Sequence, residues 1–146
     1  MSSSTKKSNV QLYTDQTPNG VKISIALEEL GLPYEVHSMN ISTNKQKEDW
    51  FLKINPNGRI PAITDTMTVD GKEETIRIFE SASILLYLIE NYDPEYKLSY
   101  PRGSKEQYEV VNWLMFQNAQ HGPMQGQANH FYRYVSRPGT ITDHPS

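Results

Sequence analysis

Residues 55–65 read Asn-Pro-Asn-Gly-Arg-Ile-Pro-Ala-Ile-Thr-Asp. The first four are typical of a turn, and residues 59–65 are typical of a strand with a proline near its start. Asn, Pro and Gly are the residues that tight turns favour, so residues 55–58 are predicted to reverse the chain. The Ile60–Pro61 bond leaves two alternatives open. In the common one it is trans, and Pro61 simply opens a strand. In the other it is cis, and the N–H and C=O of Ile60 face outward, where they could pair with an extended peptide ligand.

Toward the N-terminus, the sequence predicts a strand, a helix, a second strand and a short helix. Residues 10–13 are typical of a strand, and the turn formers at 14–20 end it. The helix that follows has one apolar stripe, a glycine at its C-cap and a proline that prevents its continuation. Residues 34–39 are the second strand and residues 45–52 the short helix. The stripe and its stop signals are Ile23, Ala26, Leu27 and Leu30, then Gly31 and Pro33.

Toward the C-terminus, the sequence predicts a hairpin and another helix. Asp70-Gly71 lies between two β-prone runs, which is the signal of a two-residue hairpin turn. The element order is therefore β-α-β-α-β-β-α. It predicts an α/β fold in which a right-handed crossover joins a parallel pair and the hairpin adds antiparallel strands. The last helix starts near Glu80 and Ser81, with an apolar stripe at Leu85, Leu88, Ile89 and Tyr92.

The last third of the chain is expected to be mostly helical. A linker with two prolines and a glycine at residues 93–103 precedes Ser104, which forms a capping box with Gln107. The helix that they open is apolar over a broad surface, which indicates burial on more than one side. Gly122-Pro123 is expected to break or kink it, and residues 124–134 continue as a helix. The predicted organisation is a disordered tail (1–9), an α/β domain (10–95) and a partial helical domain (104–146).

The composition excludes several classes of function. The 146 residues carry a formal net charge of −3, so the chain has no general attraction for nucleic acid or anionic membranes. Its longest apolar run, residues 84–89, is too short to span a bilayer, and its first residues do not form a secretory signal. The absence of cysteine removes disulfides, thiolate metal sites and a cysteine nucleophile, and it fits a cytoplasmic location. No metal site is expected, because the four histidines lack the spacing of metal ligands: His37, His121, His130 and His144.

Two helix starts carry residues that could bind a ligand. At Glu80 and Ser81, free N–H groups and the helix dipole attract a carboxylate, and Glu80 could accept from an ammonium group. The pair would hold an amino-acid head group that bears both charges; the alternative is plain helix capping. Thr17 and Asn19 place a hydroxyl and an amide at the other helix start, where a ligand thiol would be pushed toward the thiolate. The alternative there is that Asn19 is simply an N-cap.

In combination, these motifs closely resemble the N-terminal domain of glutathione transferases. The resemblance rests on residues 17–20 (Thr-Pro-Asn-Gly), on the turn and proline at 55–62, and on residues 79–88, which begin Phe-Glu-Ser-Ala. The chain is also similar to two classes in particular, the bacterial nu class and the fungal nitrogen-regulator class. This similarity rests on residues 113–117 (Trp-Leu-Met-Phe-Gln), 122–124 (Gly-Pro-Met) and 126–127 (Gly-Gln). The resemblance extends over residues 10–134.

The resemblance implies a thioredoxin-like fold and a set of contacts to glutathione. Asn19, with Thr17 beside it, would donate to the sulfur, and Gln46 would contact the glycine end. Ile60, before a cis Pro61, would pair with the cysteinyl backbone, and Glu80 and Ser81 would hold the γ-glutamyl head. Gln117 and Arg59 would contribute less directly, across a dimer.

The resemblance also implies a function. Members of these classes lack the catalytic tyrosine of animal forms and tend to reduce disulfides through glutathione. The expected activity is therefore that of a glutathione-dependent transferase or disulfide reductase, with glutathione as co-substrate and a small electrophile or disulfide as second substrate. Complete members have a longer helical bundle and are expected to be homodimers, so the all-α segment of this chain is expected to be truncated. The alternatives are a non-catalytic glutathione-binding regulator with a protein partner, or an incomplete fragment of such an enzyme.

Overall fold

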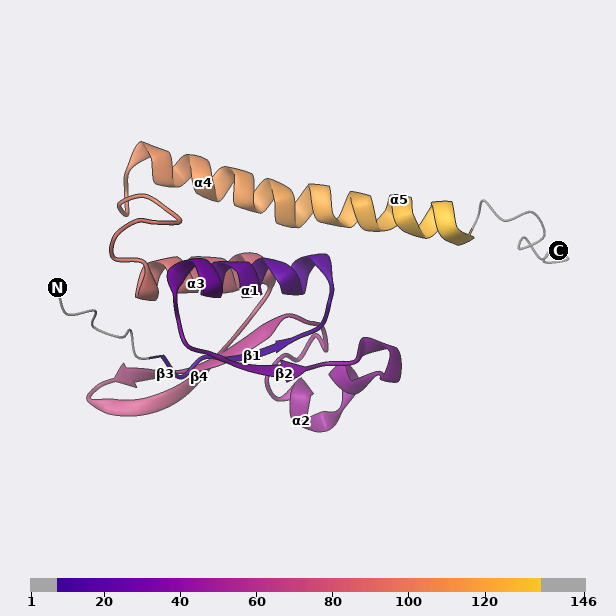
Figure 1. The fold of residues 1–146 in the computed structure, drawn as a ribbon, viewed down its shortest axis with the longest axis horizontal. Helices are drawn as coiled ribbons and strands as arrows, with labels where there is room; N and C mark the ends of the chain where they lie inside the picture. Colours follow the sequence, from indigo (N-terminus) through magenta and orange to yellow (C-terminus); the bar gives the residue numbers. More distant parts are fainter. Residues whose placement is uncertain (1–7, 135–146) are drawn as a thin grey trace, which may run out of the picture. The chain divides into compact units, whose positions relative to one another are not determined.

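The computed structural model describes residues 8–134, which divide into two compact units between residues 102 and 103. The predicted tail therefore lies almost entirely outside the described residues, as does the chain after residue 134. Figure 1 shows the fold. The first unit contains, in chain order, β1 (Gln11–Thr14), α1 (Pro18–Leu30), β2 (Glu35–Ser38), two 3-10 turns (Ile41–Thr43 and Lys45–Lys47), α2 (Asp49–Leu52), β3 (Ala62–Val69), β4 (Lys72–Phe79) and α3 (Ser81–Tyr92).

The first unit is built on a four-stranded mixed sheet of order β2-β1-β3-β4. β1 and β2 are parallel and are connected through α1, while β3 pairs antiparallel with both β1 and β4. Asp70 and Gly71 join β3 to β4, and both have the positive φ that a two-residue hairpin requires (49° and 77°). The predicted thioredoxin-like α/β fold is confirmed.

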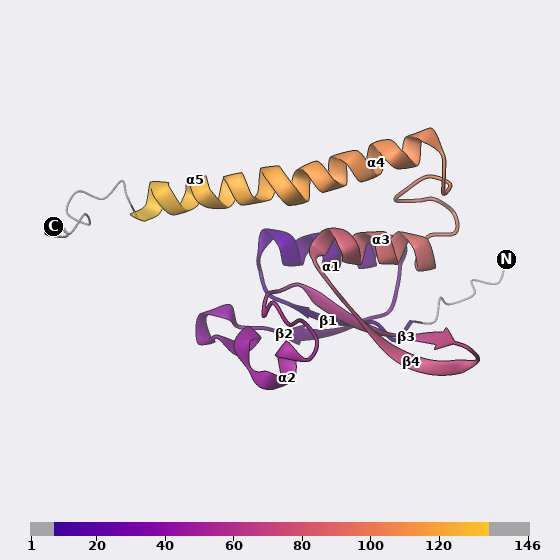
Figure 2. The same cartoon turned by 180° about the vertical axis from the view of Figure 1, so that it is seen from behind.

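The two faces of the sheet carry separate hydrophobic cores. α1 and α3 lie side by side on one face in both views, and α2 lies on the other (Figures 1 and 2). The stripe predicted for α1 is confirmed, because all four of its residues are buried. Under the two helices they meet Leu12 and Ile63 of the sheet. The second core is smaller and is formed by Met39, Phe51 and Ala62.

Two predicted elements differ in extent. Residues 45–52 do not form one helix but a 3-10 turn followed by the single turn of α2. Phe51 is the only residue of these two elements that is buried, so little packing supports a longer helix against the sheet. β3 begins at Ala62 rather than at residue 59, because Pro61 has no N–H to donate to the sheet.

The stripe predicted for α3 is shifted. The buried residues are Ser81, Ala82, Ile84 and Leu88, whereas the expected Leu85 and Tyr92 are only partly buried against the core. Residues 84–89 are apolar almost throughout, so their periodicity does not single out one face of the helix. The small side chains at the helix start decide it, because they allow close contact with the sheet.

A buried carboxylate ties α3 to β3. Asp65 is 2% exposed, and its Oδ2 accepts hydrogen bonds from the hydroxyls of Tyr87 (2.8 Å) and Tyr92. Its Oδ1 accepts from the N–H of Thr66 (2.7 Å). Burial, and then the hydrogen bond to Asp65, raise the pKa of both tyrosines above the ordinary value. The network is therefore fully satisfied as long as the tyrosines keep their protons.

The second unit is a single helical run. It consists of α4 (Lys105–Phe116), a π-helix (Gln117–His121) and α5 (Gly122–Tyr134). Ser104 caps α4 as predicted, because its Oγ accepts from the N–H of Gln107 (3.1 Å). The return bond of the capping box differs, since Gln107 Oε1 accepts from Gly103 (2.7 Å). No residue of α4 is buried, contrary to the expectation that its broad apolar surface is covered on more than one side.

Of the expected break or kink at Gly122-Pro123, the break does not occur. The turn before the proline widens, and the N–H of Gly122 donates to the carbonyl of Gln117, five residues back. This places Pro123 in the first turn of α5, where its missing N–H costs little. The helix thus continues through a proline by changing its hydrogen-bond pattern.

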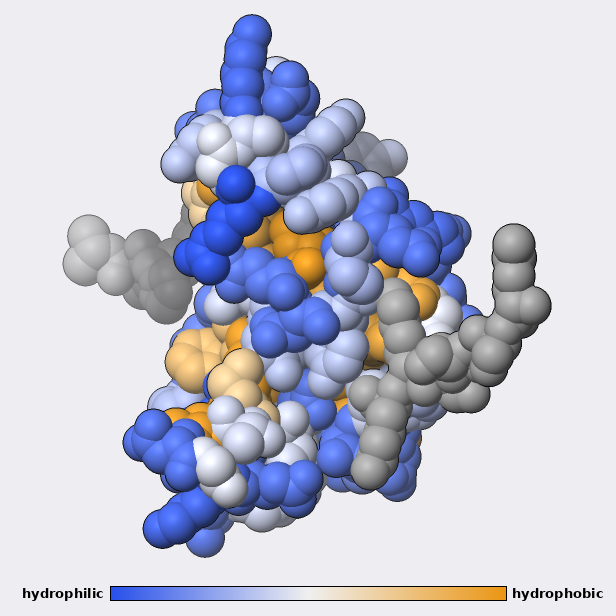
Figure 3. Space-filling view, turned by 90° about the vertical axis from the view of Figure 1, so that its left-hand side faces the viewer, coloured by the Kyte–Doolittle hydropathy of each residue, from blue (hydrophilic) through white to orange (hydrophobic). Residues whose placement is uncertain are grey.

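The surface seen in Figure 3 is largely hydrophilic, with hydrophobic residues visible in small separate areas. This agrees with the low mean hydropathy of the chain, −0.65. Of the helices between residues 8 and 134, none is both long enough and apolar enough to cross a membrane.

Candidate functional site

The sheet topology brings the three predicted ligand-binding segments to one end of the sheet. Tyr13, near the end of β1, pairs with Ala62 at the start of β3, and Ala62 pairs in turn with Phe79 at the end of β4. α1 begins shortly after β1, and α3 begins two residues after Phe79. The starts of α1, β3 and α3 therefore lie next to one another, although their residues are up to about 60 positions apart in the chain.

Thr17, not Asn19, caps α1. Thr17 Oγ1 accepts from the N–H of Gly20 (3.1 Å), and Asn19 is the second residue of the helix. Asn19 is exposed, and its side chain makes no hydrogen bond to any other residue between 8 and 134. The alternative that Asn19 serves as the N-cap is therefore wrong. The amide is held at the positive end of the helix dipole, where it can donate to an anion.

Gly20 allows α1 to start close to the sheet. A Cβ at this position would lie 2.2 Å from Thr14 Oγ1 and 2.5 Å from the carbonyl oxygen of Asp15. The second of these is a backbone atom that cannot move aside. The glycine thus lets the first turn of α1, with Thr17 and Asn19, approach the end of β1.

The Ile60–Pro61 peptide bond is cis, which is the form implied by the resemblance. Within residues 8–134, neither the N–H nor the C=O of Ile60 takes part in a hydrogen bond, although the residue is half-buried. Backbone groups of this kind are normally paired. An extended peptide that lies beside Ile60, at this end of the sheet, would pair them.

Asn55 shapes the turn before this bond, a role that sequence analysis did not predict. It is 1% exposed, and its Nδ2 donates to the carbonyl of Arg59 (2.7 Å) while its Oδ1 accepts from the N–H of Asn57 (3.0 Å). Its backbone carbonyl accepts from Gly58 (2.8 Å). One buried amide therefore holds the chain from Asn55 to Arg59, and with it the position of Ile60.

Gln46 lies beside the same turn. A Cβ at Gly58 would come within 2.9 Å of the Gln46 carbonyl oxygen, so the two segments are in close contact. Gln46 Oε1 is buried and has no hydrogen-bond partner among the described residues. A buried oxygen without a donor is unusual. A ligand N–H would satisfy it.

Arg59 is exposed, next to Ile60.

Glu80 and Ser81 occupy the start of α3 without capping it in the usual way. Glu80 is at the N-cap position, but its side chain makes no cap hydrogen bond, so plain side-chain capping does not describe Glu80. Its φ of 69° is rare for a residue with a side chain and costs about 1–3 kcal/mol. Residues in strained backbone conformations cluster at functional sites, where the surrounding structure holds the conformation in place. Ser81 is 3% exposed.

Lys22 also reaches this helix start, and sequence analysis missed it. Its Nζ donates to Ser81 Oγ (2.9 Å), across 59 positions of sequence. Burial lowers the pKa of Lys22 below the ordinary value for lysine. The available signal was helical spacing, since Lys22 lies three residues after Asn19 and four before the buried Ala26.

Two other expectations concern residues away from this end of the sheet. Gln117 belongs to the second unit, where it starts the π-helix, and its contribution to ligand binding stays a prediction. Among the described residues there is no group of three or more side chains that could hold a metal ion, and His144 lies outside them.

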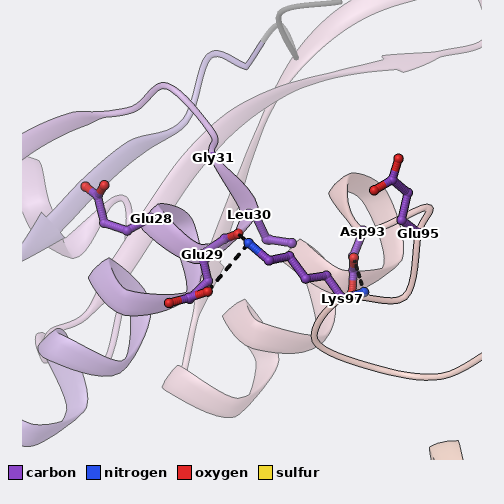
Figure 4. A pocket seen from close by; sticks show the side chains of 7 residues that line it. All are labelled: Glu28, Glu29, Leu30, Gly31, Asp93, Glu95 and Lys97. Atoms are coloured by element: carbon purple, nitrogen blue, oxygen red, sulfur yellow. Dashed lines mark hydrogen bonds and ion pairs between the residues drawn. The ribbon is translucent and has the colours of Figure 1, made fainter. Parts of the chain in front are cut away.

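A pocket lies at the opposite end of α1. It is lined by the last turn of α1 and by the loop after α3, and the Lys97 ammonium bridges the two at 3.5 Å from Glu29 Oε2 (Figure 4). Both side chains are more than half exposed, so this pair contributes little stability. α1 has 13 residues, which places the pocket about 20 Å from Thr17. None of the predicted site residues lines it.

The sheet order, the cis proline at one end of the sheet and the two helix starts beside it define a thioredoxin-like protein. The model of the glutathione S-transferase N-terminal domain matches residues 17–91. The chain belongs to the glutathione S-transferase family.

Three comparisons place the chain among known proteins. It is 40% identical over 129 residues to the glutathione S-transferase-like protein gedE of Aspergillus terreus, covering 88% of this chain and 54% of that protein. It is 39% identical over 122 residues to the disulfide-bond oxidoreductase YfcG of Escherichia coli, covering 84% and 54%. The structure of a glutathione transferase homolog from Lodderomyces elongisporus, with two GSH per subunit, has 50% identity and a TM-score of 0.80, covering 88% and 59%. The chain thus spans little more than half the length of these relatives.

Proposed function

We propose that the first unit binds glutathione at the end of the sheet beside the Ile60–Pro61 bond, and that the whole protein uses it as a transferase or disulfide reductase. The observation that carries the proposal is the meeting of the α1 start, the cis bond and the α3 start at one end of the sheet. The relatives support it, since one structure is described with two GSH per subunit and one relative is named a disulfide-bond oxidoreductase.

Each part of glutathione has a group suited to it. The N–H and C=O of Ile60 pair with the cysteinyl unit, and Gln46 Oε1 accepts an N–H at the glycine end. Glu80 accepts from the γ-glutamyl ammonium, while Ser81 and the start of α3 hold the carboxylate. Gln117 and Arg59, a homodimer, and a small electrophile or disulfide as second substrate belong to the same proposal.

The start of α1 favours the thiolate. Glutathione supplies the thiol nucleophile, and the chain supplies its position and the stabilisation of its charge. Lowering a thiol pKa from about 8.5 to about 6.5 requires about 2.7 kcal/mol. The helix dipole and two donors, the Asn19 amide and the Thr17 hydroxyl, can supply this amount. Thr17 accepts from Gly20 and so keeps its own proton to donate.

Calorimetric titration of the chain with glutathione tests the binding. Glu80→Gln keeps the shape of the side chain but removes its charge, so affinity should fall about 10- to 150-fold, the value of a charge-assisted hydrogen bond. Glu90→Gln, in the last turn of the same helix, is the matched control and should bind like the wild type. Glutathione that lacks its free amine should bind the wild type poorly. Equal affinity of the Glu80 and Glu90 variants would remove the head-group clamp from the proposal.

Turnover of a small dialkyl disulfide tests the chemistry. Asn19→Ala should lower turnover more than it lowers glutathione affinity, because the amide acts on the sulfur. Unchanged turnover would move this role to Thr17 or elsewhere. Binding of glutathione with no turnover at all would favour the non-catalytic regulator over the enzyme.

A further inference from the structure

The Lys22 ammonium lies inside the candidate site rather than on the open surface. It donates to Ser81 Oγ at 2.9 Å and comes from the second turn of α1, so it joins the two helix starts that form the site. Lys22 is half-buried, and its lowered pKa reflects loss of water around the charge. A partly desolvated ammonium is stabilised by an anion close to it.

The direction of this hydrogen bond sets what Ser81 can do. An ammonium group has only protons to give, so Ser81 Oγ must be the acceptor. The hydroxyl proton of Ser81 is then donated to a different atom, and a carboxylate oxygen is a strong acceptor for it. Because an O–H···O bond spans about 2.7 Å, a carboxylate bound to Ser81 lies within about 6 Å of Lys22 Nζ. At that distance opposite charges attract appreciably.

We propose that Lys22 is a positioning residue for the α-carboxylate of the γ-glutamyl group, which it orients through Ser81 and attracts by its charge. The inference rests on the proposed binding of glutathione. It adds to that site a residue from α1 that recognises the carboxylate, whereas the ammonium of the same head group is left to Glu80.

The test pairs variants of the chain with variants of the ligand. Lys22→Met keeps the aliphatic stem but removes the charge, and Lys22→Arg keeps the charge. Each is titrated with glutathione and with 4-aminobutyryl-cysteinyl-glycine, which retains the amine but lacks the α-carboxylate. Lys22→Met should bind glutathione about tenfold more weakly than the wild type, yet bind the analogue within about twofold of it, since only the carboxylate contact is lost. Lys22→Arg should keep at least part of the preference for glutathione.

A second comparison asks whether Lys22 acts through Ser81. If it does, the double variant Lys22→Met/Ser81→Ala should bind little worse than Ser81→Ala alone, because coupled residues are not additive. Lys72→Met removes the same charge from the exposed start of β4 and should bind glutathione like the wild type. Thermal unfolding of every variant identifies those that fail to fold.

A titration of the wild type tests the same role of Lys22. Variants are needed there only to assign the NMR signal of Lys22. The pKa of Lys22, followed by the NMR shift of its Cε, should rise when glutathione saturates the chain, since a nearby carboxylate favours the charged form. It should not rise with the analogue.

The outcomes separate the two proposals. If the wild type binds neither ligand, the proposed function fails and the inference with it. If the wild type binds glutathione but Lys22→Met weakens both ligands equally, or the pKa of Lys22 is unmoved by glutathione, the site stands and the role of Lys22 is refuted.

Discussion

The two units of the chain are stabilised in different ways. Every buried hydrophobic side chain of residues 8–133 belongs to the first unit, where two cores cover the two faces of the sheet. In the second unit several large apolar side chains are exposed, including Trp113, Phe116 and Phe131. The second unit is helical because of local signals: the Ser104 cap, the hydrogen bonds along the backbone and the π-turn before Pro123.

This difference separates secondary structure from stability. Helix formation is cooperative but marginal in water, and most helical stability in proteins comes from packing an apolar face. α1 has such packing, with a stripe of four buried residues, whereas no residue of α4 is buried. Two helices of 13 and 12 residues with good caps should therefore behave very differently in solution.

The largest expected effect is on backbone hydrogen exchange. Amides of β1 and β3 open only when the first unit unfolds, so they should exchange at least about a thousandfold more slowly than those of α4 and α5. Mass-spectrometric or NMR exchange on purified chain measures this, with light scattering to establish the oligomeric state. Equal protection of both units in a monodisperse monomer would contradict the comparison. Protection of α4 only in an oligomer would mean that copies of the chain cover its apolar residues.

The same substitution should have opposite signs in the two units. Gly20→Ala forces a Cβ against Thr14 and the Asp15 carbonyl, so it should lower the unfolding free energy of the first unit by about 3 kcal/mol. A Cβ at Gly126 in α5 meets nothing within 4 Å. Gly126→Ala should therefore raise local helix stability by about 0.5–1 kcal/mol. Chemical denaturation measures the first effect and far-UV circular dichroism the second. Two changes of the same sign would refute the assigned contacts.

The polar network around Asp65 should matter only to the first unit. Tyr87→Phe removes one donor to a buried carboxylate and should cost about 2 kcal/mol of unfolding free energy. Tyr96→Phe is the control, since Tyr96 is 51% exposed. Denaturation followed by tyrosine absorbance measures the loss. A loss no larger than that of the control would show that water replaces the Tyr87 hydroxyl.

The smallest expected effect is on stability at alkaline pH. The pKa of Tyr87 is raised in the folded protein, so above its ordinary value of about 10 the unfolded chain releases a proton that the folded chain keeps. The contribution of this tyrosine is therefore complete below about pH 10 and is lost as pH rises further. The gap in unfolding free energy between wild type and Tyr87→Phe should narrow from pH 9 to about pH 11. Parallel curves would mean that Tyr87 titrates alike in both states.

Sequence reasoning succeeded where local pattern and tertiary structure agree. The α1 stripe, the Gly31 C-cap and the Asp70-Gly71 turn were predicted and are present, because each depends on residues within one turn or one helix. The buried face of α3 differs from the predicted stripe. The helix carries its own apolar residues on all sides, and only contact with the sheet selects the face that is buried.

The candidate site depends more on long-range pairing. The cis form of Ile60–Pro61 follows from resemblance rather than from any local signal, since most such bonds are trans. Lys22 and Ser81 are 59 positions apart, and only the strand order brings α1 and α3 together. Asn55 looked like an ordinary turn residue, because its burial depends on segments that pack over it.

The closeness of Ser8 to Tyr92 has a consequence for protein engineering. The Ser8 side chain lies near enough to the Tyr92 hydroxyl to act on its pKa, in the lowering direction, so the chain enters β1 and leaves α3 at neighbouring points. Both points lie at the end of the sheet opposite to the Ile60–Pro61 bond, because β1 starts there and α3 ends there. A short linker could join them and the chain could be reopened at the exposed Asp70-Gly71 turn. Such a circular permutant would carry any attached label or support on the side away from the candidate site.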